Sequence, residues 1–102
     1  MNIVTNIKDN VMYVSFIGEL DEYTSGYTRM YLDNAFKEND FGSVVLDMTY
    51  LGFMDSTGIG VLLGRYKYLK SQRKDIYISN PNSTIEKIFN MSGIFEIMPK
   101  IS

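Results

Sequence analysis

A short apolar strand, a glycine-rich loop and an amphipathic helix, in that order, constrain the fold of this chain more than any other feature. Residues 43–48 (Ser-Val-Val-Leu-Asp-Met) form an apolar run typical of a buried strand. Residues 59–69 then carry apolar side chains at spacings of three and four, which predicts a helix with one face on a sheet. The centre of the chain is therefore predicted to be a strand, a loop and a helix packed on the sheet.

The loop supplies short oxygen-bearing side chains where the helix is expected to begin. Asp55, Ser56 and Thr57 precede the apolar periodicity, and the first backbone N–H groups of a helix need acceptors. We predict Ser56 as the N-cap. Gly58 and Gly60 add no bulk to the first turn, so another protein could reach the Ser56 hydroxyl. Most serines at such positions only cap a helix, so this feature alone does not define a function.

The two faces of the central helix differ in character. The face expected to pack on the sheet consists of Ile59, Leu62, Leu63, Tyr66 and Leu69. The opposite face consists of Thr57, Val61, Gly64, Arg65 and Tyr68. A solvated face is normally charged, whereas this one has a single charge. The pattern fits a docking surface that begins beside Ser56 and an ordinary surface with isolated apolar residues equally well.

The segments before the central strand predict a hairpin and a helix. Residues 3–7 and 11–18 alternate or are rich in β-branched and aromatic residues, with Asp9-Asn10 between them as the turn. A helix is expected from Thr24 or Ser25 to about Lys37. Its core face would consist of Ser25, Thr28, Leu32, Ala35 and Phe36. On its other side, Tyr27, Met30 and Tyr31 are expected to be peripheral packing rather than a second exposed patch.

The segments after the central helix predict a strand over 75–79 and another helix. Ser83 and Glu86 have the spacing of a capping box at the start of that helix, and Gly93 can end it. Residues 97–101 could add a last strand, confined to a sheet edge by Pro99. The expected fold is α/β: one domain over 1–102, with a mixed sheet in the order β-β-α-β-α-β-α-β and helices packed against it.

Composition excludes several classes of site. The chain has no cysteine and no histidine, so a disulfide, a thiol nucleophile, a Ser-His-Asp triad and a histidine metal site are excluded. A net charge of −2 with scattered Lys and Arg argues against nucleic-acid binding. No run reaches membrane-spanning length and no signal-peptide pattern is present. We expect a cytoplasmic protein that does not bind membranes, with no metal or cofactor.

Two kinds of chemistry remain as alternatives. The glycine loop could bind a nucleotide, but Gly58-x-Gly60-x-x-x-Gly64 matches neither the P-loop nor the dinucleotide spacing. Asp47 or Asp55 could accept phosphate as in a receiver domain, but the acidic pair that would hold magnesium is missing. Ser56 has no base to activate it, so we expect no enzymatic activity.

The run over 53–67 (Phe-Met-Asp-Ser-Thr-Gly-Ile-Gly-Val-Leu-Leu-Gly-Arg-Tyr-Lys) resembles the signature of the anti-sigma-factor antagonists of the STAS domain family. Residues 18–21 (Gly-Glu-Leu-Asp) and 91–95 (Met-Ser-Gly-Ile-Phe) resemble two further stretches of that family, in the same order. The resemblance covers nearly the whole chain and is greatest to the sporulation branch; general-stress antagonists share the fold. Thr57 stands where a second serine is common. Members of the family usually carry one further helix after the last strand, and we expect no counterpart of it in the residues up to Ser102.

The resemblance implies a phosphorylation switch. Ser56 would be phosphorylated by an anti-sigma factor serine kinase and dephosphorylated by a PP2C-type phosphatase. The unphosphorylated form would bind the kinase and release its sigma factor, and the acidic loop at Asp21 would lie beside Ser56 and contact the kinase. The expected partner-binding residues are Asp21, Met54, Asp55, Ser56, Thr57, Gly58, Val61, Gly64 and Arg65.

Overall fold

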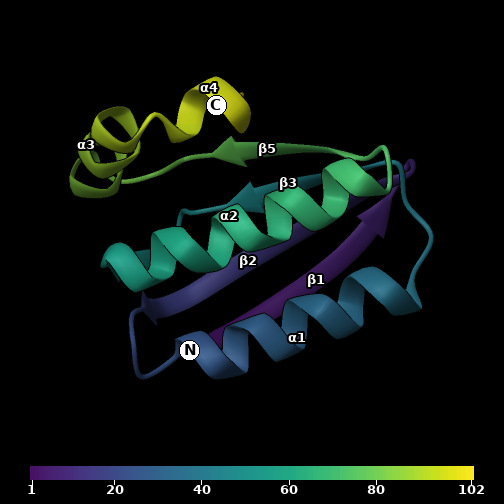
Figure 1. Cartoon of the computed structure of the whole chain (residues 1–102), viewed down its shortest axis with the longest axis horizontal. Helices are drawn as coiled ribbons and strands as arrows, with labels where there is room; N and C mark the ends of the chain where they lie inside the picture. Colours follow the sequence, from purple (N-terminus) through teal and green to yellow (C-terminus); the bar gives the residue numbers. More distant parts are fainter.

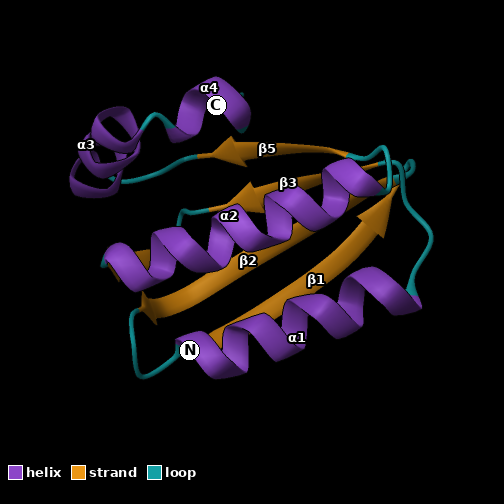
Figure 2. Ribbon diagram, in the orientation of Figure 1, coloured by secondary structure: helices purple, strands orange, loops and turns teal.

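A mixed sheet with helices on one face and along one edge organises the computed structural model, which describes all 102 residues (Figures 1 and 2). The strand order is β1-β2-β3-β5, and β4 pairs with the end of β2. The β1–β2 pair is antiparallel, and the remaining pairs are parallel. The elements are β1 (Asn2–Lys8), β2 (Val11–Leu20), α1 (Ser25–Glu38), β3 (Ser43–Asp47), β4 (Leu51–Met54), α2 (Ser56–Ser71), β5 (Asp75–Ser79), α3 (Ser83–Ser92) and α4 (Ile94–Ile97).

The first hairpin forms as predicted. Asp9 and Asn10 adopt φ values of 51° and 67°, which are the left-handed conformations that a two-residue hairpin turn requires and that these residue types tolerate. The turn places Ile3 opposite Phe16. Both side chains are buried on the face of the sheet that the helices cover.

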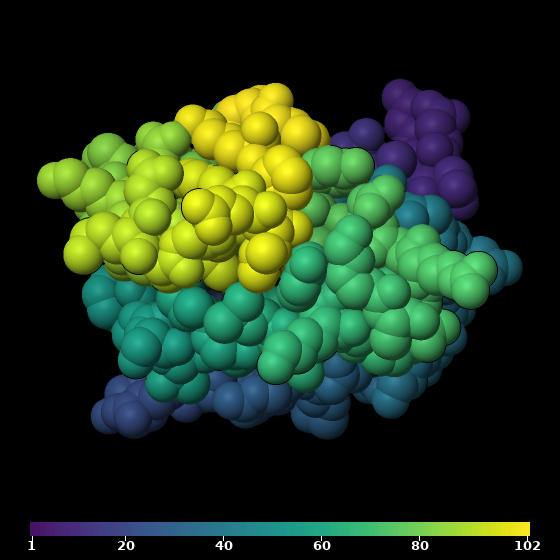
Figure 3. Space-filling model, turned by 45° about the horizontal axis from the view of Figure 1, so that its top comes forward, coloured from purple at the N-terminus to yellow at the C-terminus, as the bar shows by residue number.

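The core lies between the sheet and the helices α1 and α2, which run side by side over one face (Figure 1). The helices α3 and α4 lie beyond the β5 edge. Figure 3 shows the C-terminal residues packed directly against α2. The central strands and the two helices all contribute fully buried side chains: Met12, Val14, Phe16, Leu32, Val44, Leu46, Leu62 and Leu69.

The structure confirms the predicted fold class but changes the element order in two places. The chain forms an additional strand, β4, before the central helix. The strand expected over 97–101 is replaced by the short helix α4 and a single parallel bridge between Ile78 and Lys100. Since Pro99 has no N–H, it contributes only its carbonyl, which accepts from the Ile78 amide at 2.9 Å. The pairing therefore stays too short to form a strand.

Both predicted serine caps are wrong by one residue. Helix α2 is capped by Asp55, whose Oδ1 accepts from the Gly58 amide at 3.0 Å, so Ser56 is the first helical residue. Helix α3 is capped in the same way by Asn82 in place of Ser83. In each case an Asx residue directly precedes the serine and takes the cap position.

The predicted capping box of α3 is consequently absent. Glu86 lies one residue too far along the helix to reach back to its cap, and its carboxylate instead forms an ion pair with Lys100. The predicted end of the helix is correct, because Gly93 terminates α3 with φ 75°.

The outward face predicted for α2 is also wrong. Val61 is 1% exposed, and Arg65, on the same face, forms an ion pair with Asp33 of α1 at 3.1 Å. This face therefore packs against α1 and is not a docking surface. Gly64 differs from Val61, because a Cβ at its position would meet nothing within 4 Å.

The exposed side of α1 departs from expectation as well. The core face is as predicted, with Ser25, Thr28, Leu32 and Phe36 buried. Tyr27 and Met30 were expected to pack at the periphery, but they are 47% and 61% exposed. Tyr31 alone behaves as expected, since it is half-buried against the core.

Gly58 allows α2 to start directly against β2. A Cβ at Gly58 would lie 2.7 Å from the Leu20 carbonyl oxygen and 2.7 Å from Cγ of Met54. A Cβ at Gly60 would meet nothing within 4 Å. The first glycine is thus required by packing, whereas the second leaves the exposed side of the first turn bare.

Replacing Val61 by Glu should lower the free energy of unfolding by about 3 kcal/mol or more, because an unpaired carboxylate would be buried between α1 and α2. Gly64→Arg, on the open side of the helix, should change it by less than about 1 kcal/mol. Urea denaturation of both variants measures the difference, and equal stability of the two would contradict the placement of Val61.

The two glycines of the first turn should respond oppositely to alanine. Gly58→Ala should destabilise the protein by about 1–3 kcal/mol, because α2 would have to move away from β2. Gly60→Ala should stabilise it by up to about 1 kcal/mol through helix propensity. The comparison uses chemical denaturation, and a stable Gly58→Ala protein would contradict the close approach.

Candidate functional site

The candidate site lies at the end of the sheet where the parallel strands β2, β3 and β5 finish. Figure 1 shows that α1 and α2 both begin at this end and that α3 lies beside it. Ligand and partner sites of open α/β sheets are typically found at the carboxyl ends of parallel strands. The predicted residues around Ser56 are located here.

The side chain of Ser56 is exposed to solvent and has no hydrogen-bond partner in the chain. Ser56 is the first residue of α2, and its hydroxyl forms no hydrogen bond within the chain, because Asp55 serves as the cap. Thr57, the neighbouring hydroxyl, is half-buried. Another protein could therefore reach the Ser56 hydroxyl more easily than that of Thr57.

Asp21 builds the turn that leads into α1. Its Oδ1 accepts from the amides of Tyr23 at 3.0 Å and Thr24 at 3.1 Å. The Thr24 hydroxyl in return accepts from the Asp21 amide at 3.0 Å. This reciprocal pair resembles a capping box one turn before the helix. The other carboxylate oxygen of Asp21 has no partner in the chain and is free for an external contact.

Leu20 holds the Asp21 turn and the Ser56 loop together. In the parallel pairing of β2 with β4, Leu20 lies opposite Met54, and the Asp55 amide donates to the Leu20 carbonyl at 3.3 Å. Asp21 and Asp55 each follow directly after one of these two paired residues. The structure therefore places the two carboxylates at the ends of neighbouring strands, with Ser56 next to them.

Five of the nine predicted partner-binding residues are not part of the accessible surface around Ser56. Gly58 and Val61 are buried, and Met54 is 1% exposed. The side chain of Arg65 is 15% exposed and is paired with Asp33. Gly64 lies two turns along α2. Asp21, Asp55, Ser56 and Thr57 thus form the accessible set, which we call the Ser56 rim.

An apolar groove beside the Ser56 rim was missed by the sequence analysis. It has a volume of about 410 Å³, lies between the start of α2 and the helix α3, and is lined by Met54, Asp55, Ser56, Ile59, Ile88, Met91 and Ser92. Met91 is 88% exposed. In the sequence, Ile88 is indistinguishable from a core residue of an amphipathic helix, so only the packing of α3 beside α2 reveals the groove.

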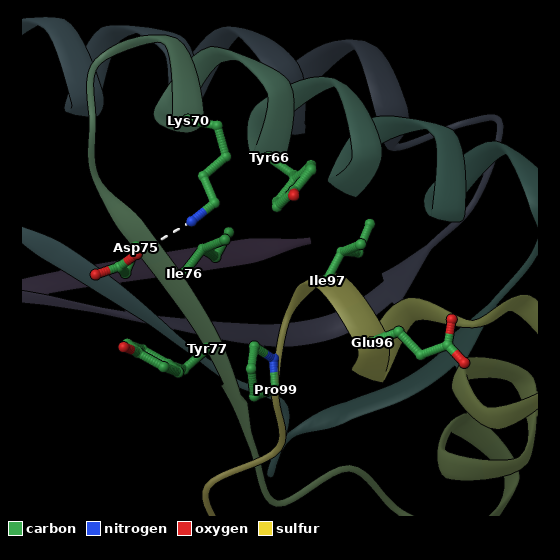
Figure 4. A pocket seen from close by; sticks show the side chains of 8 residues that line it. All are labelled: Tyr66, Lys70, Asp75, Ile76, Tyr77, Glu96, Ile97 and Pro99. Carbon is green, nitrogen blue, oxygen red and sulfur yellow. Dashed lines mark hydrogen bonds and ion pairs between the residues drawn. The ribbon is translucent and has the colours of Figure 1, made fainter.

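A second hollow, of about 300 Å³, lies at the other end of α2, between its last turns, β5 and α4 (Figure 4). Figure 4 shows Lys70 reaching Asp75 at its edge, and the two groups are 3.1 Å apart. This hydrogen bond raises the pKa of Lys70 above its ordinary value. The Lys70 charge is thus paired with a carboxylate, and one of its three N–H donors is occupied.

Asp47, considered as a receiver-type phosphate acceptor, has both carboxylate oxygens in hydrogen bonds, with Ser15 on one and Thr49 on the other. No three metal-ligating side chains are grouped together. None of the helices combines the length and apolar character needed to cross a membrane.

A family model and related proteins of known function all assign this chain to the same protein family. The family model described as the STAS domain matches residues 2–102. The chain is 39% identical over 89 residues to an anti-sigma F factor antagonist of Paenibacillus polymyxa, covering 87% of this chain and 76% of that protein. It is 29% identical over 98 residues to an anti-sigma-B factor antagonist of Staphylococcus aureus, covering 96% and 90%.

A solved structure supports the fold independently. The anti-sigma factor antagonist SpoIIAA in its unphosphorylated form superposes with a TM-score of 0.82, at 24% identity, covering 99% of this chain and 89% of that chain. At this identity the likeness concerns the fold. Together with the family model and the P. polymyxa relative, it shows that this chain belongs to the STAS domain family, among the anti-sigma factor antagonists.

Proposed function

We propose that this chain is a phosphorylation-switched regulator that binds an anti-sigma factor serine kinase when Ser56 is unmodified. Binding releases the sigma factor held by that kinase, and phosphorylation of Ser56 by the kinase ends the interaction. A PP2C-type phosphatase restores the active form. The observation that carries the proposal is the exposed Ser56 hydroxyl, which is free of hydrogen bonds because Asp55 caps the helix.

The Ser56 rim and the adjoining groove form the proposed docking surface. The rim offers carboxylates from Asp21 and Asp55, and the groove offers apolar area from Ile59 and Met91. A partner that carries basic groups beside an apolar segment would complement both parts. Such a protein acts by binding and not by catalysis, and we place its action in the cytoplasm, where sigma factors operate.

The names of the relatives indicate which pathway to test first. The P. polymyxa relative is an antagonist of an anti-sigma F factor, and the S. aureus relative is an antagonist of an anti-sigma-B factor. Since the former is the more similar in sequence, we propose the sporulation type of control over transcription. The general-stress type is the alternative that a binding assay with both kinds of anti-sigma factor would separate.

Charge explains how modification could switch binding without unfolding the domain. A phosphate adds about −1.5 to −2 charges. At the start of α2 it would lie near the positive end of the helix dipole and near amides that have no helical acceptor, so the fold should persist. The same charge would stand beside Asp55 and Asp21. An interface formed around a neutral hydroxyl would then bury an unpaired anion, which weakens binding.

Ser56→Ala should abolish phosphate uptake from the cognate kinase and ATP, because the only exposed hydroxyl at the start of α2 is removed. Thr57→Val is the matched control and should still accept one phosphate per chain. Intact-mass and peptide mass spectrometry measure both. Stoichiometric phosphorylation of the Ser56→Ala protein would assign the acceptor elsewhere.

A sigma-release assay with ATP should show that the neutral form of residue 56 is active and that a negatively charged form is inactive. Ser56→Ala should release sigma at least as persistently as the wild type, since it keeps a small neutral group. Ser56→Asp adds a third carboxylate to the rim, and a loss of about 3 kcal/mol would weaken kinase binding on the order of a hundredfold. Equal failure of the two variants would contradict a charge-operated switch.

A further inference from the structure

Helix α1 and the turn that leads into it carry three exposed apolar side chains, which we call the stripe. Tyr23 is 87% exposed, Tyr27 47% and Met30 61%. Their spacings of four and three residues place them on one side of the helix and its leading turn. Large apolar side chains exposed singly are normal, but three in register form a continuous surface of the kind that binds other proteins.

The stripe is held in place by contacts on its inner side. The ring of Tyr27 packs against that of Tyr31 with a centroid separation of 6.1 Å, and the Tyr31 hydroxyl lies 3.5 Å from that of Thr5 in β1. The Tyr23 amide donates to Asp21 at 3.0 Å. The ring of Tyr27 is therefore partly ordered before binding, which lowers the entropy that this side chain loses when a partner covers it, whereas the bond at Tyr23 fixes only the backbone of the leading turn.

The stripe is continuous with the Ser56 rim. Tyr23 lies two residues after Asp21 in the same turn, and the Leu20 carbonyl joins this turn to Asp55. Farther along, α1 is tied to α2 by the pair of Asp33 and Arg65. Figure 1 shows that both helices begin at the same end of the molecule. One partner could therefore contact the rim and the stripe together.

The size of a stable interface requires such an extension. A specific complex typically buries about 800 Å² on each partner, which is about one seventh of the 5652 Å² surface of this chain. The Ser56 rim and the adjoining groove together comprise nine residues, whereas an interface of this size uses about 20 to 30 residues on each side. Aromatic residues and methionine are enriched in the buried centre of interfaces, and the stripe provides them.

The acidic residues around the stripe indicate what kind of partner covers it. Glu19, Asp21 and Glu22 lie at the start of the stripe, with Asp55 beside them. A second copy of the chain carries the same net charge of −2, so two copies gain no long-range electrostatic attraction. A different partner with an apolar patch bordered by basic residues would complement both the stripe and the acidic groups beside it. We propose that the anti-sigma factor extends over the stripe of Tyr23, Tyr27 and Met30, an inference that rests on the proposed function.

The test compares two double variants with the wild type. Tyr23→Ser with Met30→Ser removes the two most exposed side chains of the stripe and leaves the Tyr27–Tyr31 packing intact. Val4→Ser with Tyr13→Ser is the matched control, because those side chains are 55% and 41% exposed on the opposite face of the sheet. Affinity for a purified anti-sigma factor kinase with bound ADP is measured by titration calorimetry, and thermal denaturation establishes that each variant is folded.

We expect the stripe variant to bind at least tenfold more weakly than the wild type and the control variant to stay within about twofold. A folded stripe variant with wild-type affinity would overturn the extension while leaving the proposed function intact. Failure of the wild type to bind any anti-sigma kinase would instead overturn the proposed function. A wild type that sediments as a dimer, together with a monomeric stripe variant of unchanged kinase affinity, would assign the stripe to self-association and overturn the inference.

If the stripe variant melts at a lower temperature than the control, a further double variant, Tyr23→Phe with Met30→Leu, tests whether the apolar area of the stripe contributes to binding. It keeps the apolar area and the helix and should restore binding to within about threefold of the wild type. Restored folding without restored affinity would overturn the role of the stripe as an apolar contact.

Discussion

The close contact between Gly58 and the Leu20 carbonyl determines how the rest of the site is built. It allows the first turn of α2 to lie directly against the end of β2. The Asp55 amide donates a hydrogen bond to the same Leu20 carbonyl and so holds the two segments together. Without it, the loop that carries Ser56 and the turn that carries Asp21 would be separate surface features. With it, they form one rim whose geometry is set by backbone atoms and a helix cap.

The sequence was sufficient for the parts of the fold that depend on local chemistry. The hairpin turn at Asp9 and Asn10, the buried strand β3 and the end of α3 at Gly93 each follow from residue types that permit few conformations. Caps were harder to predict because an Asx residue and a serine stood side by side in both loops. Hydrogen-bond geometry, which the sequence does not contain, selects Asp55 and Asn82.

The orientation of α2 could not be obtained from periodicity. A single amphipathic face is expected for a helix that has one neighbour, but α2 packs against the sheet, against α1 and beside the C-terminal helices (Figure 3). Val61 and Arg65 are consequently covered by α1, although the pattern of apolar residues placed them outside. The predicted Ser56 position was exposed nonetheless, since it depends on where the helix begins and not on its phase. The groove toward Met91 depends on contacts between distant segments and left no sequence signal.

The double use of Asp21 and Asp55 restricts how this surface can diverge among related chains. Each carboxylate accepts backbone hydrogen bonds that start a helix or its leading turn, and each also sets the negative charge beside Ser56. Side chains that keep such caps are limited to Asp, Asn, Ser and Thr. Mutational drift at these positions can therefore neutralise the surface in single steps but cannot reverse its sign without weakening the start of α1 or α2. For a binding partner, the charge at these two positions can therefore vary between negative and neutral but cannot become positive. The complementary surface of the partner can accordingly vary only between basic and neutral.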